Sequence, residues 1–217
     1  PRPVPAEIMQ AQNQLLASEV TARGVVDGAR LPSLADEPRI TLWKGDITQL
    51  RVTAIVNAAN PQLLGCFWPL HRCIDNAIHS AAGMGLREEC ARIMSQRGRP
   101  EPAGTATLTG AYCLPALHVV HTVGPVVRDR LTSEHEGQLA SCYTSCLEAA
   151  VGAGCSTIAF CCISTGEYGY PKDKAADVAV GVVSDCLPRY PTIRKVIFNV
   201  FTSDDEAIYR KLLGPDG

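Results

Sequence analysis

Residues 157–171 read TIAFCCISTGEYGYP, and a run with helical spacing follows at residues 172–187. The segment 157–163 is almost continuously apolar, which is typical of a strand that is buried on both faces. Turn-forming and small residues then fill the segment 164–169 before the helix begins. A buried strand, a short loop and a helix in this order predict an α/β fold with a largely parallel sheet.

The same alternation of strands and helices extends on both sides of this unit. We expect strands at residues 40–43, 53–57, 105–109, 118–123, 157–163 and 196–201. We expect helices at residues 70–97 (interrupted near Gly83 and Gly85), 136–150, 172–187 and 204–213. The six strands would form one mixed, largely parallel central sheet with helices on both faces, which is a three-layer α/β/α domain.

The first part of the chain has a different pattern. Apolar residues recur near helical spacing within residues 5–30, and residues 31–38 contain two prolines and mixed charges. We therefore interpret residues 1–38 as an N-terminal helical extension with a linker, and residues 39–217 as one α/β domain.

Composition and charge exclude several classes of protein. The chain has 217 residues, of which 46% are hydrophobic and 19% charged, so it is predicted to fold around a sizeable core. Its 20 Lys and Arg residues against 22 Asp and Glu residues provide no basic surface for a phosphate backbone, so we expect no nucleic-acid partner. No apolar run approaches the roughly 20 residues that span a bilayer, so we expect no membrane association.

Ten cysteines are present, and several lie inside apolar runs such as residues 158–163. A secreted domain held by disulfides would be shorter and richer in loops. Reduced cysteine packs as a small apolar residue, so we interpret most of these cysteines as core residues of a cytoplasmic protein.

The loops after the strands are the expected place for chemistry, because ligands of open α/β sheets bind at the carboxyl ends of the strands. Residues 57–61 follow the second strand, and residues 164–171 follow the fifth. Free backbone N–H groups at the start of the next helix would favour an anion such as a phosphate. An ordinary connecting loop is the alternative, since both common nucleotide-binding fingerprints are absent.

Four motifs in order resemble those of the macrodomain family: GDIT at 45–48, NAAN at 57–60, HTVGP at 121–125 and STGEYGYP at 164–171. The resemblance covers residues 40–213. It implies a three-layer α/β/α fold with a mixed sheet whose cleft binds ADP-ribose.

The resemblance also implies roles for individual residues at the adenine end of that cleft. Asp46 would accept a hydrogen bond from the adenine amino group, and the amide of Ile47 would assist. Phe201 would stack on the adenine ring. Considered alone, Asp46 could equally be a turn residue and Phe201 a core aromatic residue.

At the other end, the resemblance implies a loop that wraps the diphosphate through backbone amides. The loop residues are Ser164, Thr165, Gly166, Glu167 and Tyr168. Tyr168 would also pack against the distal ribose, whose hydroxyl groups Asn60 would hold. Glu167 could alternatively contact the modified side chain or help to place water.

The segment after NAAN differs from the glycine-rich loop of many macrodomains and reads GCFWPLHRCIDNAIH at residues 65–79. It resembles the zinc-containing subclass, which implies that Cys66, His71 and Cys73 hold one zinc ion per chain. Thiolates and imidazole are preferred zinc ligands, and three protein ligands leave one position open, as in catalytic sites. The alternative is two reduced core cysteines and a surface histidine.

The predicted helix from residue 70 places these ligands near its start, with Pro69 at the first helical position. Two thiolates and a neutral imidazole cancel the charge of the ion. A neutral zinc site lowers the pKa of water less, so we favour a zinc that holds an oxygen of the distal ribose.

Asp75 follows His71 by four residues, so the predicted helix carries both on one face. In hydrolytic macrodomains without zinc, an acidic residue at the matching place activates water or the ribose. We therefore predict Asp75 and Asn60 as catalytic residues, with a solvated helix carboxylate as the alternative for Asp75. His79 and His121 are interpreted as structural.

The resemblance implies a zinc-dependent mono-ADP-ribosyl hydrolase that cleaves O-linked ADP-ribose from modified proteins. The alternatives are a module that binds ADP-ribose without cleavage and an O-acetyl-ADP-ribose deacetylase. A metal with an open position beside a carboxylate favours the hydrolase. Some relatives in the zinc subclass are encoded beside a sirtuin-like ADP-ribosyltransferase, which is a candidate partner system. We expect a monomer.

Overall fold

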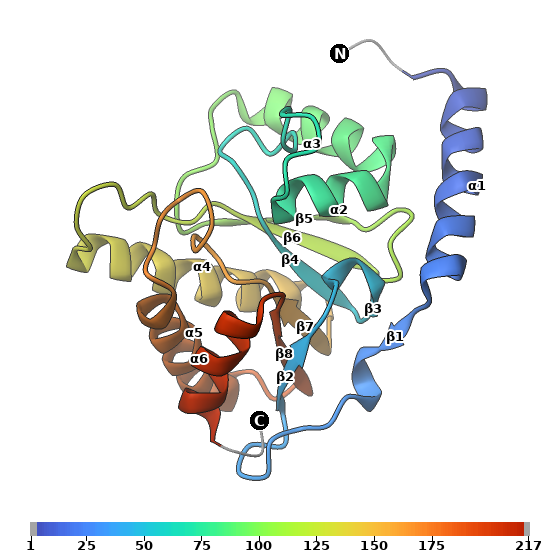
Figure 1. The fold of residues 1–217 in the computed structure, drawn as a ribbon. Coiled ribbons are helices and arrows are strands. Elements are labelled where there is room, and N and C mark those ends of the chain that lie inside the picture. Colours follow the sequence, from blue (N-terminus) through green and yellow to red (C-terminus); the bar gives the residue numbers. More distant parts are fainter. Residues whose placement is uncertain (1–3, 215–217) are drawn as a thin grey trace.

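The structure is a computed structural model and describes residues 4–214. Its main feature is a sheet of six strands in the order β2-β8-β7-β4-β6-β5 (Figure 1). The strands are β2 Ile40–Lys44, β4 Ala54–Ala58, β5 Ala106–Gly110, β6 His118–Thr122, β7 Thr157–Phe160 and β8 Lys195–Val200. Only β5 is antiparallel to its neighbour, so the carboxyl ends of the other five strands lie at one edge. The predicted mixed, largely parallel sheet is confirmed.

Helices cover both faces of this sheet, which gives the predicted three layers (Figure 1). On one face, α2 (Ile74–Ala82) packs on β4 and α3 (Met84–Arg97) packs on β5. On the other face lie α4 (Ser133–Gly152), α5 (Lys172–Cys186) and α6 (Ser203–Leu213). Short 3-10 helices are η1 Gly28–Arg30, η2 Ile47–Gln49 and η3 Leu187–Arg189.

The core forms where these layers meet. All of β8 is buried, and Tyr143 of α4 packs against Phe160 of β7 with ring centroids 5.0 Å apart. Full burial of an apolar side chain of this size contributes about 1.5–3 kcal/mol. Six cysteines are buried and unpaired, as the reduced-core interpretation predicts: Cys90, Cys142, Cys146, Cys155, Cys161 and Cys186.

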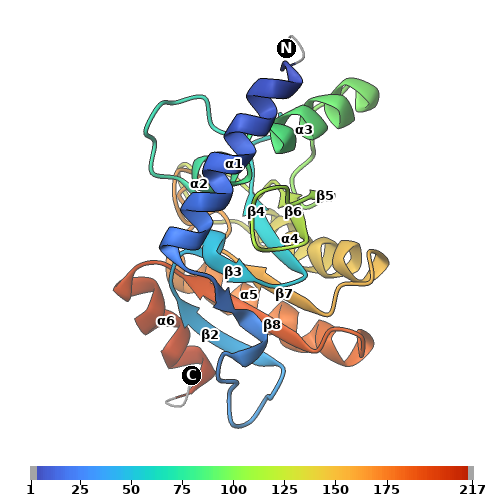
Figure 2. The same ribbon diagram turned by 90° about the vertical axis from the view of Figure 1, so that its right-hand side faces the viewer.

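The N-terminal segment forms a helix, α1 (Ala6–Arg23), that lies against the corner between α2 and α3 (Figure 2). Gln12 of α1 accepts a hydrogen bond at 2.7 Å from the backbone N–H of Met84, the first residue of α3. No side chain of α3 itself caps this end. Leu16 packs against the same corner at Gly83, where a Cβ atom would lie 2.9 Å from its Cδ1. The Gln12 side chain of α1 therefore caps the N-terminus of α3.

Several predicted boundaries were wrong. The helix at 5–30 ends at Arg23, because Gly24 has φ +83°. The strand at 157–163 ends at Phe160, where the loop begins to turn. Two strands of two residues, β1 (Val26–Asp27) and β3 (Leu50–Arg51), were too short to be recognised in the sequence.

The largest correction concerns the helix expected from residue 70, which begins instead at Ile74. Leu70 has φ +59°, a left-handed conformation that a helix cannot contain. The Sγ atom of Cys73 caps α2 by accepting the N–H of Asn76 at 3.4 Å. Pro69 and His71 therefore lie in a loop, and His71 and Asp75 do not share one helix face.

Within residues 4–214, no helix combines the length and the apolar character needed to cross a bilayer.

Candidate active site

The carboxyl ends of the parallel strands open into a cleft of about 1170 Å³. The cleft is lined by the segments that follow β2, β4, β7 and β8. Every residue that the sequence assigned to a ligand or a metal lines it: Asp46, Ile47, Asn60, Cys66, His71, Cys73, Asp75, Ser164, Thr165, Gly166, Glu167, Tyr168 and Phe201. The topology thus gathers residues from positions 46 to 201 into one site.

Asp46 lies at the end of β2 and shapes the loop there. The Oδ1 atom of Asp46 accepts two hydrogen bonds from Thr48, one from its backbone N–H at 2.9 Å and one from its side-chain hydroxyl at 2.7 Å. Its Oδ2 lies 3.7 Å from Nη1 of Arg23, at the end of α1. Asp46 is therefore a turn residue that caps η2, and it also lines the cleft.

Phe201 follows β8 directly and is 76% exposed, although it lines the cleft. The interpretation of Phe201 as a core aromatic residue was wrong. An exposed aromatic ring beside a cleft offers a flat apolar surface on which a planar ring can stack.

The loop of residues 164–168 connects β7 to α5 and is closed by its own turn. The N–H of Gly169 donates to the carbonyl of Gly166 at 3.0 Å, and the N–H of Tyr170 donates to that of Ser164 at 3.0 Å. Among the described residues, the N–H groups of residues 165–168 have no hydrogen-bond acceptor. Consecutive free N–H groups of this kind bind anions, so the loop can hold a phosphate.

Two backbone positions keep this loop in its shape. Ser164 has φ +65°, and its buried hydroxyl has no hydrogen-bond partner. Gly169 has φ +66°, and a Cβ there would lie 2.7 Å from the carbonyl oxygen of Val127. A left-handed residue other than glycine is strained, and such strain clusters at functional sites.

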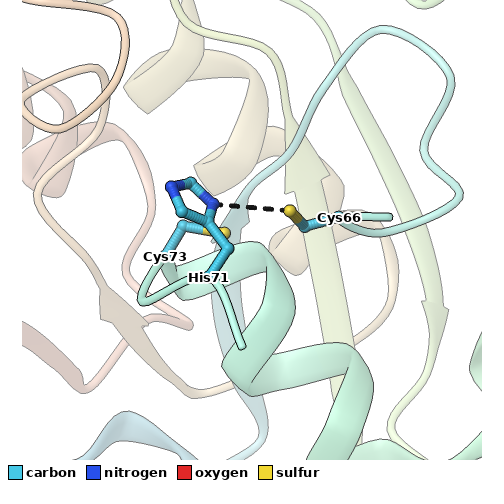
Figure 3. A group of neighbouring side chains, drawn as sticks. All are labelled: Cys66, His71 and Cys73. Atoms are coloured by element: carbon cyan, nitrogen blue, oxygen red, sulfur yellow. Dashed lines mark hydrogen bonds between the residues drawn. The ribbon is translucent and has the colours of Figure 1, made fainter. Parts of the chain in front are cut away.

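Cys66, His71 and Cys73, which all line the cleft, lie together in one cluster (Figure 3). Their ligand atoms all lie within 4.8 Å of one another. Nδ1 of His71 is 3.4 Å from Sγ of Cys66. Burial raises the pKa of the Cys73 thiol, and the neighbouring Cys66 thiol raises it further. Two thiols and an imidazole are thus held together without a disulfide.

These three residues fit a zinc ion. Tetrahedral coordination with ordinary zinc bond lengths separates a sulfur from a nitrogen ligand by about 3.6 Å. The 3.4 Å between Cys66 and His71 is close to that separation. The third ligand, Cys73, comes from the cap of α2 and lies within the same 4.8 Å group. The donor set and its spacing both suit zinc.

Asp75 lies two residues after Cys73 in the chain and is only 5% exposed. Its Oδ1 accepts a hydrogen bond from Nδ2 of Asn57 at 2.8 Å, and its Oδ2 accepts one from Nδ2 of Asn60 at 3.1 Å. The alternative of a solvated helix carboxylate was therefore wrong. Burial raises the pKa of Asp75, while the Asn57 hydrogen bond and the charge of Arg87 oppose the shift. Both predicted catalytic residues belong to one hydrogen-bonded group.

Two buried histidines, His79 and His121, lie next to the hydrogen-bonded pair of Asp75 and Asn57. Nε2 of His79 is 3.6 Å from Oδ1 of Asp75, and neither ring nitrogen of His79 has a hydrogen-bond partner. His121 is fully buried and lies between Asn57 and Thr109, at 3.2 and 3.0 Å. Burial lowers the pKa of His79 to about 4 and that of His121 to about 3. Both rings are therefore neutral in the folded protein near neutral pH.

The free energy of unfolding should fall as the pH drops from 6.5 toward 4. In the unfolded chain both histidines bind a proton below about pH 6.5, whereas the folded protein excludes it. With folded pKa values of about 4 and 3, each histidine costs roughly 2 kcal/mol of stability by pH 5. Urea unfolding at pH 7 and pH 5 measures this loss, and His79→Gln should remove about half of it. Equal stabilities of the wild-type protein at the two pH values would contradict the prediction.

Sequence reasoning missed some residues of the site. Asn57 is fully buried behind the cleft lining, and its side-chain amide donates to the carboxylate of Asp75. Lys172 and Asp205 line the cleft and form an ion pair at 2.8 Å. The position of Lys172 just after the loop of residues 164–168 was the available signal.

The chain was also compared with protein-family models and with known proteins. A family model described as "Macro domain" matches residues 56–179, which is more than half of the chain. A protein of Treponema medium named "Protein-ADP-ribose hydrolase" is 43% identical over 221 residues, covering 98% of this chain and 82% of that protein.

Two further comparisons extend the likeness. A Fusarium oxysporum protein named "Probable bifunctional ADP-ribose hydrolase/ADP-ribosyltransferase" is 50% identical over 187 residues. The match covers 82% of this chain and 31% of that protein. The crystal structure of a Trypanosoma brucei macrodomain in complex with ADP-ribose superposes with a TM-score of 0.76 and 35% identity, covering 88% of this chain and 77% of that one.

Proposed function

Because this chain belongs to the macrodomain family, we propose that it is a zinc-dependent hydrolase that removes mono-ADP-ribose from O-linked side chains of modified proteins. The names of its relatives support ADP-ribose hydrolysis, and the fold matches a macrodomain that was crystallised with ADP-ribose.

One observation carries the proposal: three zinc-type ligands stand beside a buried carboxylate in a cleft that also contains an anion-binding loop. A protein that only binds ADP-ribose needs the loop and the adenine contacts. It has no use for a metal with an open position next to Asp75. This arrangement favours hydrolysis over simple recognition.

Different residues of this chain would bind different parts of the substrate. Asp46, the amide of Ile47 and the exposed ring of Phe201 would bind adenine, and the free N–H groups of residues 165–168 would bind the diphosphate. Such contacts place the distal ribose beside Asn60 and Asp75. Precise placement of the reacting ribose lowers the barrier, because the entropy of orientation is lost on binding.

In the reaction, water adds to the anomeric carbon of the distal ribose, and the bond from that carbon to the side-chain oxygen breaks. Positive charge develops on the ribose ring in the transition state, as in other glycosidic cleavages. The Asp75 carboxylate can accept the proton of the attacking water or stabilise that charge. Zinc held by Cys66, His71 and Cys73 would supply a Lewis acid that polarises a bound oxygen.

The same site could serve an O-acetyl-ADP-ribose deacetylase, since that substrate also contains an ester on the distal ribose. The partner of a hydrolase would be a mono-ADP-ribosylated protein, made by an ADP-ribosyltransferase. The bifunctional name of the Fusarium relative supports such a pairing, and a sirtuin-like transferase is the form we propose. The cytoplasmic location and the monomeric state stay predictions.

A de-modification assay tests the proposal. Purified protein is mixed with a transferase that has modified itself on carboxylate side chains with labelled ADP-ribose. We expect release of free ADP-ribose within minutes, loss of release after chelation, and recovery with added zinc. Binding of ADP-ribose without release would favour the recognition module. Release of acetate from O-acetyl-ADP-ribose, with no release from protein, would favour the deacetylase.

The adenine contact can be tested separately from catalysis. Asp46→Asn keeps an Oδ1 that caps η2 but replaces the charged second oxygen with an amide. Loss of a charge-assisted hydrogen bond costs about 1.5–3 kcal/mol, so the Kd for ADP-ribose should rise roughly 10- to 150-fold in calorimetry.

Asp27→Asn is the matched control for this variant. Asp27 caps η1 through the N–H of Ala29 and lies outside the cleft. Its replacement should leave ADP-ribose affinity unchanged. Equal affinity of Asp46→Asn and the wild-type protein would exclude Asp46 from the adenine site.

A further inference from the structure

His71 and Glu167 form a hydrogen bond that joins two parts of the site. Nε2 of His71 lies 3.2 Å from Oε1 of Glu167, a residue 96 positions later in the chain. His71 belongs to the loop with the three metal-type ligands, and Glu167 belongs to the loop with free N–H groups. Among residues 4–214, no other hydrogen bond connects these two loops.

The two nitrogens of the His71 ring face different partners. Nδ1 points toward Sγ of Cys66 at 3.4 Å, while Nε2 points toward Glu167. A metal ligand offers a nitrogen lone pair, so the ring proton must then sit on the other nitrogen. The carboxylate of Glu167 accepts that proton's hydrogen bond and so selects the tautomer in which Nδ1 faces the metal position. The Trp68 ring stacks on His71, with centroids 6.0 Å apart, and restrains the plane of the ring.

An acidic residue inside an anion-binding loop needs an explanation. A free carboxylate there would repel a diphosphate, and Glu167 is 73% exposed at its side chain. The bond to His71 fixes the carboxylate on the metal side of the loop. A cation on His71 would strengthen this bond, since electron withdrawal makes the Nε2–H a better donor.

We propose that Glu167 is a positioning residue that orients His71 for metal binding and couples the affinity for zinc to the affinity for the diphosphate. This inference rests on the proposed zinc site. Metal binding would hold Glu167 and its loop in the conformation that exposes the N–H groups of residues 165–168. By linkage, a ligand on those N–H groups must then tighten zinc binding by the same factor.

Zinc affinity is measured by competition with a chromophoric chelator, with and without saturating ADP-ribose, on metal-free protein. Removal of an acceptor that orients a histidine ligand costs about 10- to 100-fold in metal affinity, and we expect this loss for Glu167→Ala. Glu167→Gln retains an oxygen that accepts from Nε2, so it should recover most of the affinity. Glu19→Ala, which removes an exposed glutamate of α1, is the control for charge and should bind zinc as the wild-type protein does.

The coupling gives a second readout. In the wild-type protein, we expect ADP-ribose to tighten zinc binding at least fivefold, and zinc to tighten ADP-ribose binding equally. Glu167→Ala should reduce this factor toward one. The absorption of the cobalt-substituted protein should also change in Glu167→Ala and return in Glu167→Gln, because it reports the geometry of the ligands.

The outcomes separate this inference from the proposed function. A wild-type protein that binds no zinc would remove the metal from the proposed function and this inference with it. A wild-type protein that binds zinc, together with a Glu167→Ala variant of equal zinc affinity and equal coupling, would overturn this inference alone.

Discussion

Replacing Cys73 with serine should abolish stoichiometric zinc binding and nearly all release of ADP-ribose, while the protein stays folded. Serine is a favoured helix cap, so it can still accept the N–H of Asn76 that Cys73 now accepts. Its hydroxyl is a poor zinc ligand compared with a thiolate. A metal that stabilises developing charge supplies several kcal/mol, so the rate should fall at least about 100-fold.

Metal analysis, calorimetry with ADP-ribose and the de-modification assay should be applied to the same preparations. ADP-ribose affinity should fall much less than the rate, because adenine and diphosphate contact other loops. Cys113→Ser is the matched control, since Cys113 is a partly buried free cysteine outside the cleft. A Cys73→Ser protein that keeps its zinc would reassign the ligands. Full hydrolysis by a zinc-free wild-type protein would end the proposal of zinc dependence.

Asp75→Asn should reduce the rate of hydrolysis by about 10²- to 10⁴-fold, which is the usual contribution of a general acid or base. The substitution preserves size but removes the charge. Asp75 now accepts one hydrogen bond on each oxygen, from Asn57 and from Asn60. An asparagine side chain has only one acceptor oxygen. Its NH2 group would therefore face the side-chain amide of either Asn57 or Asn60, and that hydrogen bond would be lost.

Zinc content and ADP-ribose affinity distinguish a chemical role of Asp75 from a purely structural one. The proposed ligands Cys66, His71 and Cys73 are untouched, so the variant should bind as much zinc as the wild-type protein. ADP-ribose affinity should change by less than tenfold. Asp173→Asn, in the exposed first turn of α5, is the control and should keep the wild-type rate. A zinc-loaded Asp75→Asn protein that hydrolyses at the wild-type rate would exclude Asp75 from the chemistry.

The order of strands and helices was predictable because each buried strand is a short apolar run between turn signals. The loops at residues 57–61 and 164–171 were expected to meet in one cleft, since parallel strands end at one edge. The resemblance to macrodomains added Asp46 and Phe201 to that cleft. These features depend on local pattern and on topology. Both are visible in one sequence.

The loop between β4 and α2 was harder to predict. Pro69 and the apolar spacing after it resemble a helix start, whereas Leu70 adopts a left-handed conformation that leucine rarely takes. Cysteine is not among the preferred caps, so Cys73 gave no signal for the start of α2. The correct boundary depends on contacts that only the folded loop makes, such as the hydrogen bond from Asn76 to the carbonyl of His71.

Contacts between distant segments were also invisible in the sequence. The hydrogen bond of Asn57 to Asp75 depends on how α2 lies on β4, and that of His71 to Glu167 joins two loops after different strands. Periodicity and motif spacing describe each segment by itself. The orientation of one segment against another comes from packing.

The docking of α1 has a consequence for how the molecule opens. The amide of Met84 is hydrogen-bonded to the Gln12 side chain 72 residues away, so its protection from solvent exchange depends on a helix that is distant in the sequence. Fraying of α1 would expose this amide before the sheet unfolds. The first turn of α3 and the N-terminal helix therefore form one cooperative unit, although the sequence places them in different parts of the chain.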